Sequence, residues 1–192
     1  MFYKLQDPNP RAYQYAFQDR SFRGYGKTPC PDCGRECFSA EFEGPHCLMT
    51  EGGPRYPDYL PFSGAGGPML LLSERTLEVF RAHGITGIGE VEPVQGPEVV
   101  RYRLVGVSGR VDLDLPNMCL KKKRLCSTCG GFEWNRQRMP KLCLDEQTWD
   151  GSDICRVTSI PGYVICSEAV VSLVKKEKLK GFAFEPIGSN QV

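Results

Sequence analysis

The feature that most constrains this chain is a short cysteine motif that occurs twice. Cys30-Pro-Asp-Cys33-Gly34 reads CPDCG, and Cys126-Ser-Thr-Cys129-Gly130 reads CSTCG 96 positions later. Two cysteines separated by two residues can point into one tight turn, and the glycine that follows allows a left-handed backbone there. The two motifs, hook one and hook two, supply four thiolates, which is a complete tetrahedral ligand set for zinc. We therefore predict one structural zinc ion bound by Cys30, Cys33, Cys126 and Cys129.

The residues around the hooks favour a metal site over a redox pair. Pro29, Pro31 and Gly34 surround hook one, and Gly130-Gly131 follows hook two. Such residues are typical of loops, whereas a thioredoxin-like pair needs a strand–helix setting. Inert cysteines buried in the core are the simpler alternative for the hooks.

The other cysteines leave a further alternative open. Cys47 and Cys143 occupy matching places after the two hooks, so each half of the chain can instead build its own site with help from His46 or Cys155. A disulfide scaffold is less expected, although the chain has ten cysteines, because the first twenty residues lack the apolar core of a secretory signal. We expect a cytoplasmic protein with reduced thiols.

A longer repeat surrounds the hooks. Residues 67–94 match residues 161–187 in a Ser-Glu pair, a glycine and a Glu-Pro-aliphatic triplet, in the same order. The matched segments are Ser73-Glu74 and Ser167-Glu168, Gly87 and Gly181, and Glu92–Val94 and Glu185–Ile187. This order predicts a tandem duplication of hook, variable stretch, strand, helix and strand. We expect an α+β fold of two tandem pseudo-repeats, 1–107 and 108–192, tied by a zinc-ribbon-like site into one compact unit.

Local patterns predict the elements of each copy. Two short apolar runs are expected as buried strands, and Ser73 and Ser167 are expected to cap the helices that follow them. The first helix should end at Gly84, because glycine favours the left-handed residue after a helix. The predicted strands are Met69–Leu72, Ile88–Val94, Val99–Val107, Arg110–Leu115, Tyr163–Cys166 and Phe182–Ile187. Gly52–Pro68 is rich in glycine and proline and is expected as an irregular loop.

The order of these motifs resembles the double-CxxCG motif family of myxobacteria, whose named members are immunity proteins against swarm inhibition toxins. The resemblance rests on CPDCG, CSTCG, LLLSERTLEVFRAHGITGI and WDGSDICRVTSIPGYVICSEAVVSLVKKEKLKGFAFEPI, and covers most of the chain from about Thr28 onward. It implies a protein that binds and neutralises one cognate toxin, with a purely structural zinc. The departures from the family pattern are the Gly/Pro-rich middle and the extra cysteines Cys37, Cys47, Cys119, Cys143 and Cys155.

Two stretches differ between the otherwise matching halves, and we expect them to contact the partner. They are Gly52–Gly67 and Phe132–Asp150. Binding residues tend to lie on loops held by a rigid frame, and Trp and Arg often dominate interface energies. The candidate contact residues are therefore Trp134, Arg136, Arg138 and Trp149. The alternative places both tryptophans in the core, together with Tyr56, Tyr59 and Phe62.

Charge and apolar patterning argue against membrane and nucleic-acid partners. The formal net charge is +1, so the chain as a whole does not attract polyanions. The longest apolar run, Met69–Leu72, is far too short to cross a bilayer. Lys121–Arg124 precedes hook two and supports the alternative function, a zinc-ribbon nucleic-acid-binding regulator. A solvated cationic face is the simpler interpretation of this run.

Catalysis has little support in the sequence. His46 and His83 are the two histidines, and each lies beside a proline or glycine. The chain lacks a phosphate-binding loop, a Gly-x-Ser-x-Gly motif and a His-Glu-x-x-His motif. A zinc ion held by four thiolates has no open position for a substrate. We therefore expect no enzyme, His83 at a helix end, and Cys166 in the core.

Overall fold

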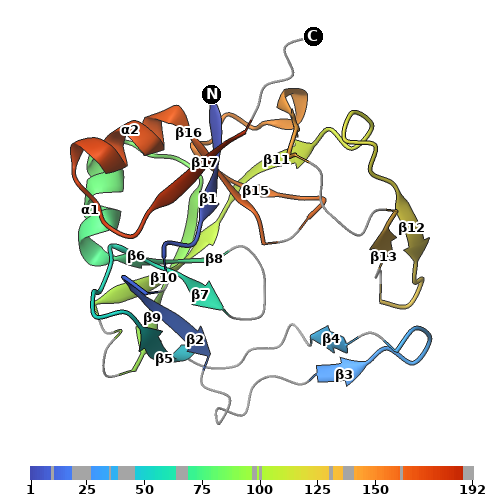
Figure 1. Cartoon of the computed structure of the whole chain (residues 1–192), viewed down its shortest axis with the longest axis horizontal. Helices are drawn as coiled ribbons and strands as arrows, with labels where there is room; N and C mark the ends of the chain where they lie inside the picture. The colour runs from blue at the N-terminus through green and yellow to red at the C-terminus, as the bar shows by residue number, and fades with distance from the viewer. Residues whose placement is uncertain are drawn as a thin grey trace.

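The computed structural model describes residues 1–9, 11–18, 27–34, 36–38, 46–63, 69–96, 99, 101–129, 132–135, 141–160 and 162–187. These residues form two larger sheets, two hairpins and two α-helices, α1 (Glu74–Ala82) and α2 (Glu168–Lys176) (Figure 1). The two helices lie side by side at one end of the molecule, away from the two hairpins. The α+β class predicted from the sequence is confirmed.

The larger sheet bends round on itself. Its strand order is β6 (Tyr59–Leu60), β8 (Met69–Ser73), β10 (Tyr102–Val107), β9 (Ile88–Gln95), β5 (His46–Gly52), β2 (Gln14–Gln18) and β7 (Phe62–Ser63). The edge strands β6 and β7 are separated in the chain only by Pro61, whose carbonyl accepts the backbone N–H of Ala16 at 2.7 Å. The sheet therefore curls round an apolar cluster made by Ala16, Leu48, Leu60, Leu71, Val94, Val99, Tyr102 and Leu104.

The smaller sheet is built mostly from the C-terminal half of the chain. Its strand order is β14 (Leu144–Asp145), β11 (Gly109–Leu113), β15 (Ile154–Val157), β16 (Val164–Ser167), β1 (Phe2–Gln6) and β17 (Ala183–Ile187). A 3-10 turn, η1 (Glu146–Thr148), follows β14. The N-terminal strand β1 thus lies between two strands of the predicted C-terminal half.

Each helix belongs to a strand–helix–strand unit of the same design. In the first unit, α1 connects β8 to β9, and β10 lies between these strands and is antiparallel to both. In the second unit, α2 connects β16 to β17, and β1 lies between them and is antiparallel to both. This is a split β-α-β arrangement in both units. The tandem duplication itself stays a prediction.

The central core joins the two units. Leu70 and Leu72 face the helices, whereas Leu71 between them faces the inside of the larger sheet. Val164 and Cys166 of β16 also face the helices. Both helices contribute buried side chains to the same cluster, namely Leu77, Phe80, Val170, Leu173 and Val174. The two units therefore pack against each other and share one core.

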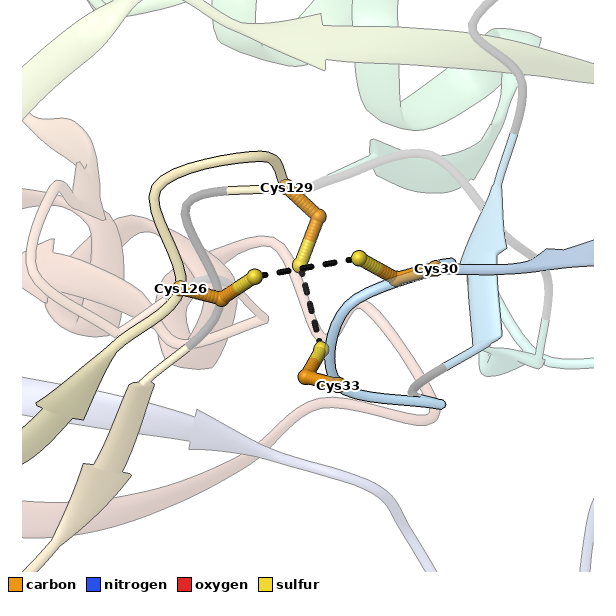
Figure 2. Close-up of side chains that lie close together, drawn as sticks. All are labelled: Cys30, Cys33, Cys126 and Cys129. Carbon is orange, nitrogen blue, oxygen red and sulfur yellow. Dashed lines mark hydrogen bonds between the residues drawn. The ribbon is translucent and has the colours of Figure 1, made fainter.

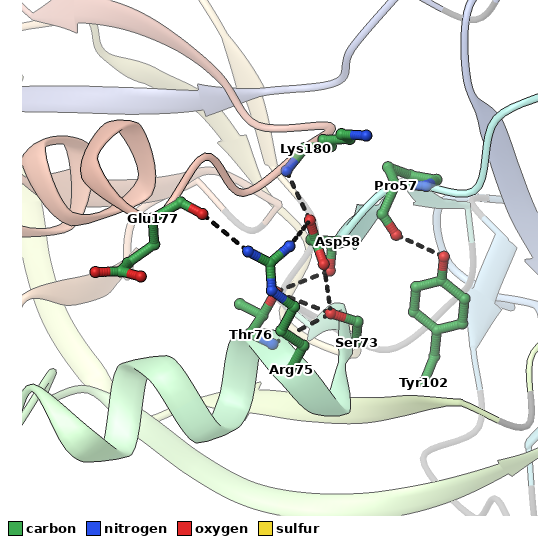
Figure 3. A network of polar contacts seen from close by, with 8 residues as sticks. All are labelled: Pro57, Asp58, Ser73, Arg75, Thr76, Tyr102, Glu177 and Lys180. Atoms are coloured by element: carbon green, nitrogen blue, oxygen red, sulfur yellow. Dashed lines mark hydrogen bonds and ion pairs between the residues drawn. The ribbon is translucent and has the colours of Figure 1, made fainter.

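Asp58 connects the start of α1 to the loop that follows α2 (Figure 3). Its carboxylate accepts the Ser73 hydroxyl at 3.0 Å and the backbone N–H of Lys180 at 2.8 Å. Arg75 bridges the same elements. Its guanidinium Nη1 lies 3.5 Å from the Asp58 carboxylate, and its Nη2 donates to the carbonyl of Glu177 at 2.9 Å. One half-buried carboxylate thus fixes the N-terminus of the first helix and the C-terminal end of the second.

Asp153 makes the reciprocal connection. Its carboxylate accepts the Ser167 hydroxyl at 2.7 Å, at the start of α2, and the backbone N–H of Thr86 at 3.1 Å, in the loop after α1. Asp58 and Asp153 also each accept the backbone N–H of their serine through their own carbonyl. We call this pair of connections the reciprocal clasp.

The predicted local elements are confirmed with small shifts in their ends. Ser73 caps α1 by accepting the backbone N–H of Thr76 at 3.2 Å, and Gly84 has a φ of +67° directly after the helix. Ser167 occupies the N-cap position of α2 but makes no capping bond with its side chain, which donates to Asp153. The strands on either side of Ser108 belong to different sheets.

The irregular loop predicted for Gly52–Pro68 is partly wrong. This stretch contains β6 and β7, and Tyr59 and Leu60 are buried on opposite faces of the larger sheet. The carbonyl of Pro57 accepts the buried Tyr102 hydroxyl at 2.6 Å. The glycines and prolines drew the prediction toward a loop, whereas two-residue strands are too short to show an alternating pattern. Residues 64–68 lie outside the described part of the chain.

Candidate metal centre

Each hook is the tip of a β-hairpin. Hook one connects β3 (Lys27–Pro29) to β4 (Glu36–Phe38), and hook two connects β12 (Lys122–Leu125) to β13 (Phe132–Trp134). Both first cysteines, Cys30 and Cys126, directly follow a strand, and the chain then turns back through the second cysteine. Gly34 has a φ of +68°, the left-handed conformation expected after hook one. The two hairpins lie on the same side of the molecule (Figure 1).

The structure brings all four hook cysteines together (Figure 2). The Sγ atoms of Cys30 and Cys126 are 3.7 Å apart, and those of Cys33 and Cys129 are 3.6 Å apart. All four sulfur atoms lie within 4.8 Å of one another. A tetrahedral site with metal–sulfur bonds of about 2.3 Å spaces its sulfur atoms about 3.8 Å apart. The donor set can therefore hold a metal ion with little rearrangement.

None of the hook cysteines is paired in a disulfide bond, and the two sulfur distances agree with this. A disulfide has an S–S distance of about 2.05 Å, well below both values. None of the eight cysteines whose side chains the structure describes is paired in a disulfide bond. The disulfide scaffold considered from the sequence is thus not found in the described part of the chain.

The local environment favours a thiolate at hook two. The backbone N–H groups of Cys129 and Thr128 point at the Cys126 sulfur and lower the pKa of this thiol to about 6. Side-chain hydrogen bonds with Cys129 and Cys30 act in the same direction. Backbone amides that donate to cysteine sulfur stabilise the charged form, which is the form that binds metals.

The site is closed and its two hooks also touch outside the cluster. Cys30 is 4% exposed and Cys126 is 9% exposed, while Cys33 and Cys129 are half-buried. The Thr128 hydroxyl donates to the Asp32 carboxylate, so the middle residues of the two turns are bonded to each other. Within hook one, the backbone N–H of Gly34 donates to the carbonyl of Cys30 at 2.8 Å. Four thiolates in this arrangement leave no ligand position for a substrate.

The other described cysteines lie elsewhere. Burial raises the pKa of Cys155 to about 12, and burial also raises the pKa of Cys166, so both thiols stay protonated in the core. Cys143 is buried with Leu113 and Leu144 on the outer side of the smaller sheet. Cys119 is exposed. Among the side chains that the structure describes, only the hook cysteines form a potential metal cluster.

The alternative of one metal site per half depends on residues of β5 (His46–Gly52). Cys47 and His46 lie in β5, but their side chains are outside the described part, as is the side chain of Cys37. His83 is the C-cap of α1, and its Nδ1 lies 3.0 Å from the carbonyl of Val79, so the helix-end interpretation of this residue is confirmed.

Of the four predicted contact residues, the structure describes one side chain fully. Trp149 is 38% exposed and packs edge-on against Phe2, with 5.1 Å between the ring centres. Its indole N–H donates to the carbonyl of Ser152 at 2.8 Å. Trp134 lies in β13, with a side chain outside the described set, and Arg136 and Arg138 are outside the described residues. Their role in binding stays a prediction.

Sequence reasoning missed the residues that hold the two units together. Asp58 and Asp153 lie outside the matched segments of the repeat, and their spacing from the helices differs between the two copies. An acidic residue far along the chain from the N-cap serine that it binds gives no local signal. The one sequence signal for Asp153 is the motif Gly-Ser-Asp at residues 151–153.

Comparisons with known proteins assign this chain to no family. No protein-family model matches the chain, and a search of curated proteins finds no significant relative. The resemblance to the double-CxxCG family therefore stays a prediction. Neither described helix has the length and the apolar stretch that a bilayer crossing requires.

Proposed function

We propose that this protein is an immunity protein that binds and neutralises one cognate bacterial toxin in the cytoplasm. The resemblance carried by the two hooks and the two Ser-Glu helices is the observation on which the proposal depends. The closed four-thiolate cluster supports it, because such a site stabilises a binding scaffold and offers no position for catalysis. In this proposal the protein acts by stoichiometric binding and not as an enzyme.

We also propose that the bound metal is zinc. Tetrahedral sites of four cysteines are typical of structural zinc, and the sulfur spacing fits its bond length. Because the hooks come from two hairpins 96 positions apart, one ion would fasten two distant parts of the chain to each other. The hooks, the helices and the clasp together would form the duplicated frame that the internal repeat predicts.

Co-expression tests the function directly. Each candidate toxin gene next to the gene of this protein is expressed in a sensitive host, with and without the protein, and growth is recorded. We expect full growth and co-purification of a complex with one toxin only. Protection without binding, or no protection against any neighbouring toxin, would overturn the proposal. An unrelated toxin of the same activity is the control for specificity.

The runner-up function is nucleic-acid binding through Lys121–Arg124. Lys122–Leu125 forms β12, so this cationic run leads directly into hook two. Phosphate contacts release counterions, and the affinity should therefore fall steeply with salt concentration. A packed protein interface responds less to salt. Retention of the protein on single- or double-stranded DNA or RNA at low salt, and loss at about 0.2 M salt, would favour this alternative.

A further inference from the structure

The C-terminal half of α2 borders a groove that has no role in the function proposed above. It has a volume of about 500 Å³ and lies between α2 and the strands β1 and β17. Tyr3, Phe182 and Phe184 are half-buried in it, while Lys175 and Lys178 are exposed beside them. We call these five residues the α2 groove.

The aromatic floor of the α2 groove is held in place by the core. Phe184 lies 6.4 Å from Tyr3 and 6.0 Å from Phe182 between ring centres. Phe182 in turn contacts Phe80 of α1 at 6.2 Å and the buried Tyr59 at 5.3 Å. The row of rings therefore runs from the central core to the surface. Rigid aromatic side chains of this kind offer apolar contact area at a low entropic cost.

The rim of the groove is cationic. Lys175 and Lys178 are the charged residues that line it, and among the described residues no carboxylate does so. Lys175–Lys180 contains four lysines and the half-buried Glu177, so the formal charge of this short segment is +3. A partner that places an apolar side chain on the rings would therefore gain from a carboxylate beside it.

The equivalent face of the first unit has a different character. Tyr3 pairs with Cys166 and Pro186, just as Arg103 pairs with Leu72 and Pro93, so Tyr3 and Arg103 occupy equivalent positions. Arg103 forms an ion pair with Glu74 of its own unit. Phe184 corresponds by the same registers to Val91. The second unit thus has aromatic rings where the first has an ion-paired arginine and a valine.

We propose that the α2 groove binds an acidic segment of the toxin, with an apolar side chain on the aromatic floor and a carboxylate between Lys175 and Lys178. This proposal rests on the proposed immunity function and names a surface for it. The surface is distinct from the stretch Phe132–Asp150 suggested by the sequence. It also explains how a nearly neutral protein can select an acidic partner, since the charge that matters is local.

Charge reversal on the rim is the test. The double variant Lys175→Glu/Lys178→Glu is compared with Arg11→Glu/Arg81→Glu, which makes the same charge change at exposed positions that do not line the groove. Binding to the purified toxin from the co-expression test is measured by calorimetry at two salt concentrations. We expect the groove variant to bind at least about tenfold more weakly and the control to bind like the wild type.

A second pair of variants tests the floor. Phe184→Ala should weaken toxin binding, whereas Val91→Ala at the equivalent position of the first unit should not, and melting curves report whether each variant is folded. If the wild type binds and the groove variants bind equally well, the groove proposal is overturned while the immunity function stands. If the wild type binds no neighbouring toxin, both proposals fall. A wild-type dimer that the rim reversal dissociates would assign the groove to a second copy of the chain and overturn the toxin assignment.

Discussion

The described cysteines divide into potential metal ligands, core residues and the exposed Cys119, and their surroundings explain the division. Cys126 receives backbone hydrogen bonds that lower its pKa, whereas burial raises the pKa of Cys155 and Cys166. The sequence predicted the four hook residues because Cys-x-x-Cys-Gly is a local motif with its own geometry. It also predicted Cys166 in the core from the apolar strand around it. Cys143 and Cys155 were ambiguous, because a single cysteine carries no such local signal.

Removing one ligand should cost both metal and stability. We expect Cys129→Ser to lose zinc and to lower the free energy of unfolding by several kcal/mol, because metal binding is coupled to folding in structural zinc sites. Zinc content and urea unfolding measure the two effects. Cys119→Ser is the control, since this exposed thiol lies outside the cluster. An unchanged melting temperature and zinc content in Cys129→Ser would count against the site.

Asp112 predicts a dependence of stability on pH. Burial alone would raise the pKa of this carboxyl, but hydrogen bonds from Ser159, Thr158 and Leu113 outweigh it, and the pKa lies below 3.8. Its contribution to stability is therefore present above the unfolded-state pKa and is lost as the pH falls through the folded-state pKa. We expect Asp112→Asn to be less stable than the wild type at pH 7. The difference should shrink as the pH falls below about 4, whereas a difference that does not change with pH would contradict this account.

At the scale of elements, both helices and most strands of the two units were predictable, whereas β1 and the connections between the units were not. The Ser-Glu helix starts and the apolar strands have periodic local signals. β6 and β7 have two residues each, and β1 contains both polar and apolar residues, so none of them stands out in the sequence. The reciprocal clasp depends on residues brought together from distant segments. Such contacts follow from the packing of the two units and have no local pattern.

Gly181 tests the part of the reciprocal clasp beside Asp58. A Cβ atom on Gly181 would lie 2.2 Å from the Pro57 Cβ and 2.5 Å from the Tyr59 carbonyl oxygen, and the φ of Gly181 is +85°. Gly84 follows the other helix with a φ of +67°, but a Cβ atom there would meet no atom of the described residues within 4 Å. We expect Gly181→Ala to destabilise the protein by clearly more than the roughly 1 kcal/mol typical of the backbone term alone, and Gly84→Ala by about that amount. Equal effects in thermal unfolding would mean that the loop after α2 moves away freely.

At the scale of the whole molecule, the two predicted halves are interleaved. β1 lies between β16 and β17, and both helices share one core with both sheets. The hooks, whose cysteines can hold a metal ion, and the reciprocal clasp connect the same two parts of the chain at different places. The sequence predicted two copies and a shared site, but nothing in it indicated that the first strand completes the second unit. That placement depends on long-range pairing, which a linear repeat search does not detect.

Truncation of the first strand tests this interleaving. Deletion of residues 2–6 removes the middle strand of the second unit and the buried Leu5, which is 8% exposed in the central core. We expect the loss of a cooperative unfolding transition, measured by circular dichroism during urea titration. Gln6→Ala is the matched control at the end of the same strand and should change stability by no more than about 0.5 kcal/mol. A truncated protein with an unchanged transition would contradict the observed strand order.

The central claim is that one metal ion joins the two hooks, and X-ray absorption at the zinc edge tests it most directly. The purified protein is also analysed for metal content per chain. We predict one zinc ion per chain with four sulfur neighbours at about 2.3 Å, falling to three in Cys33→Ser if the ion is retained. Two zinc ions per chain, or nitrogen neighbours in the wild type, would contradict the shared site and favour a separate site in each half.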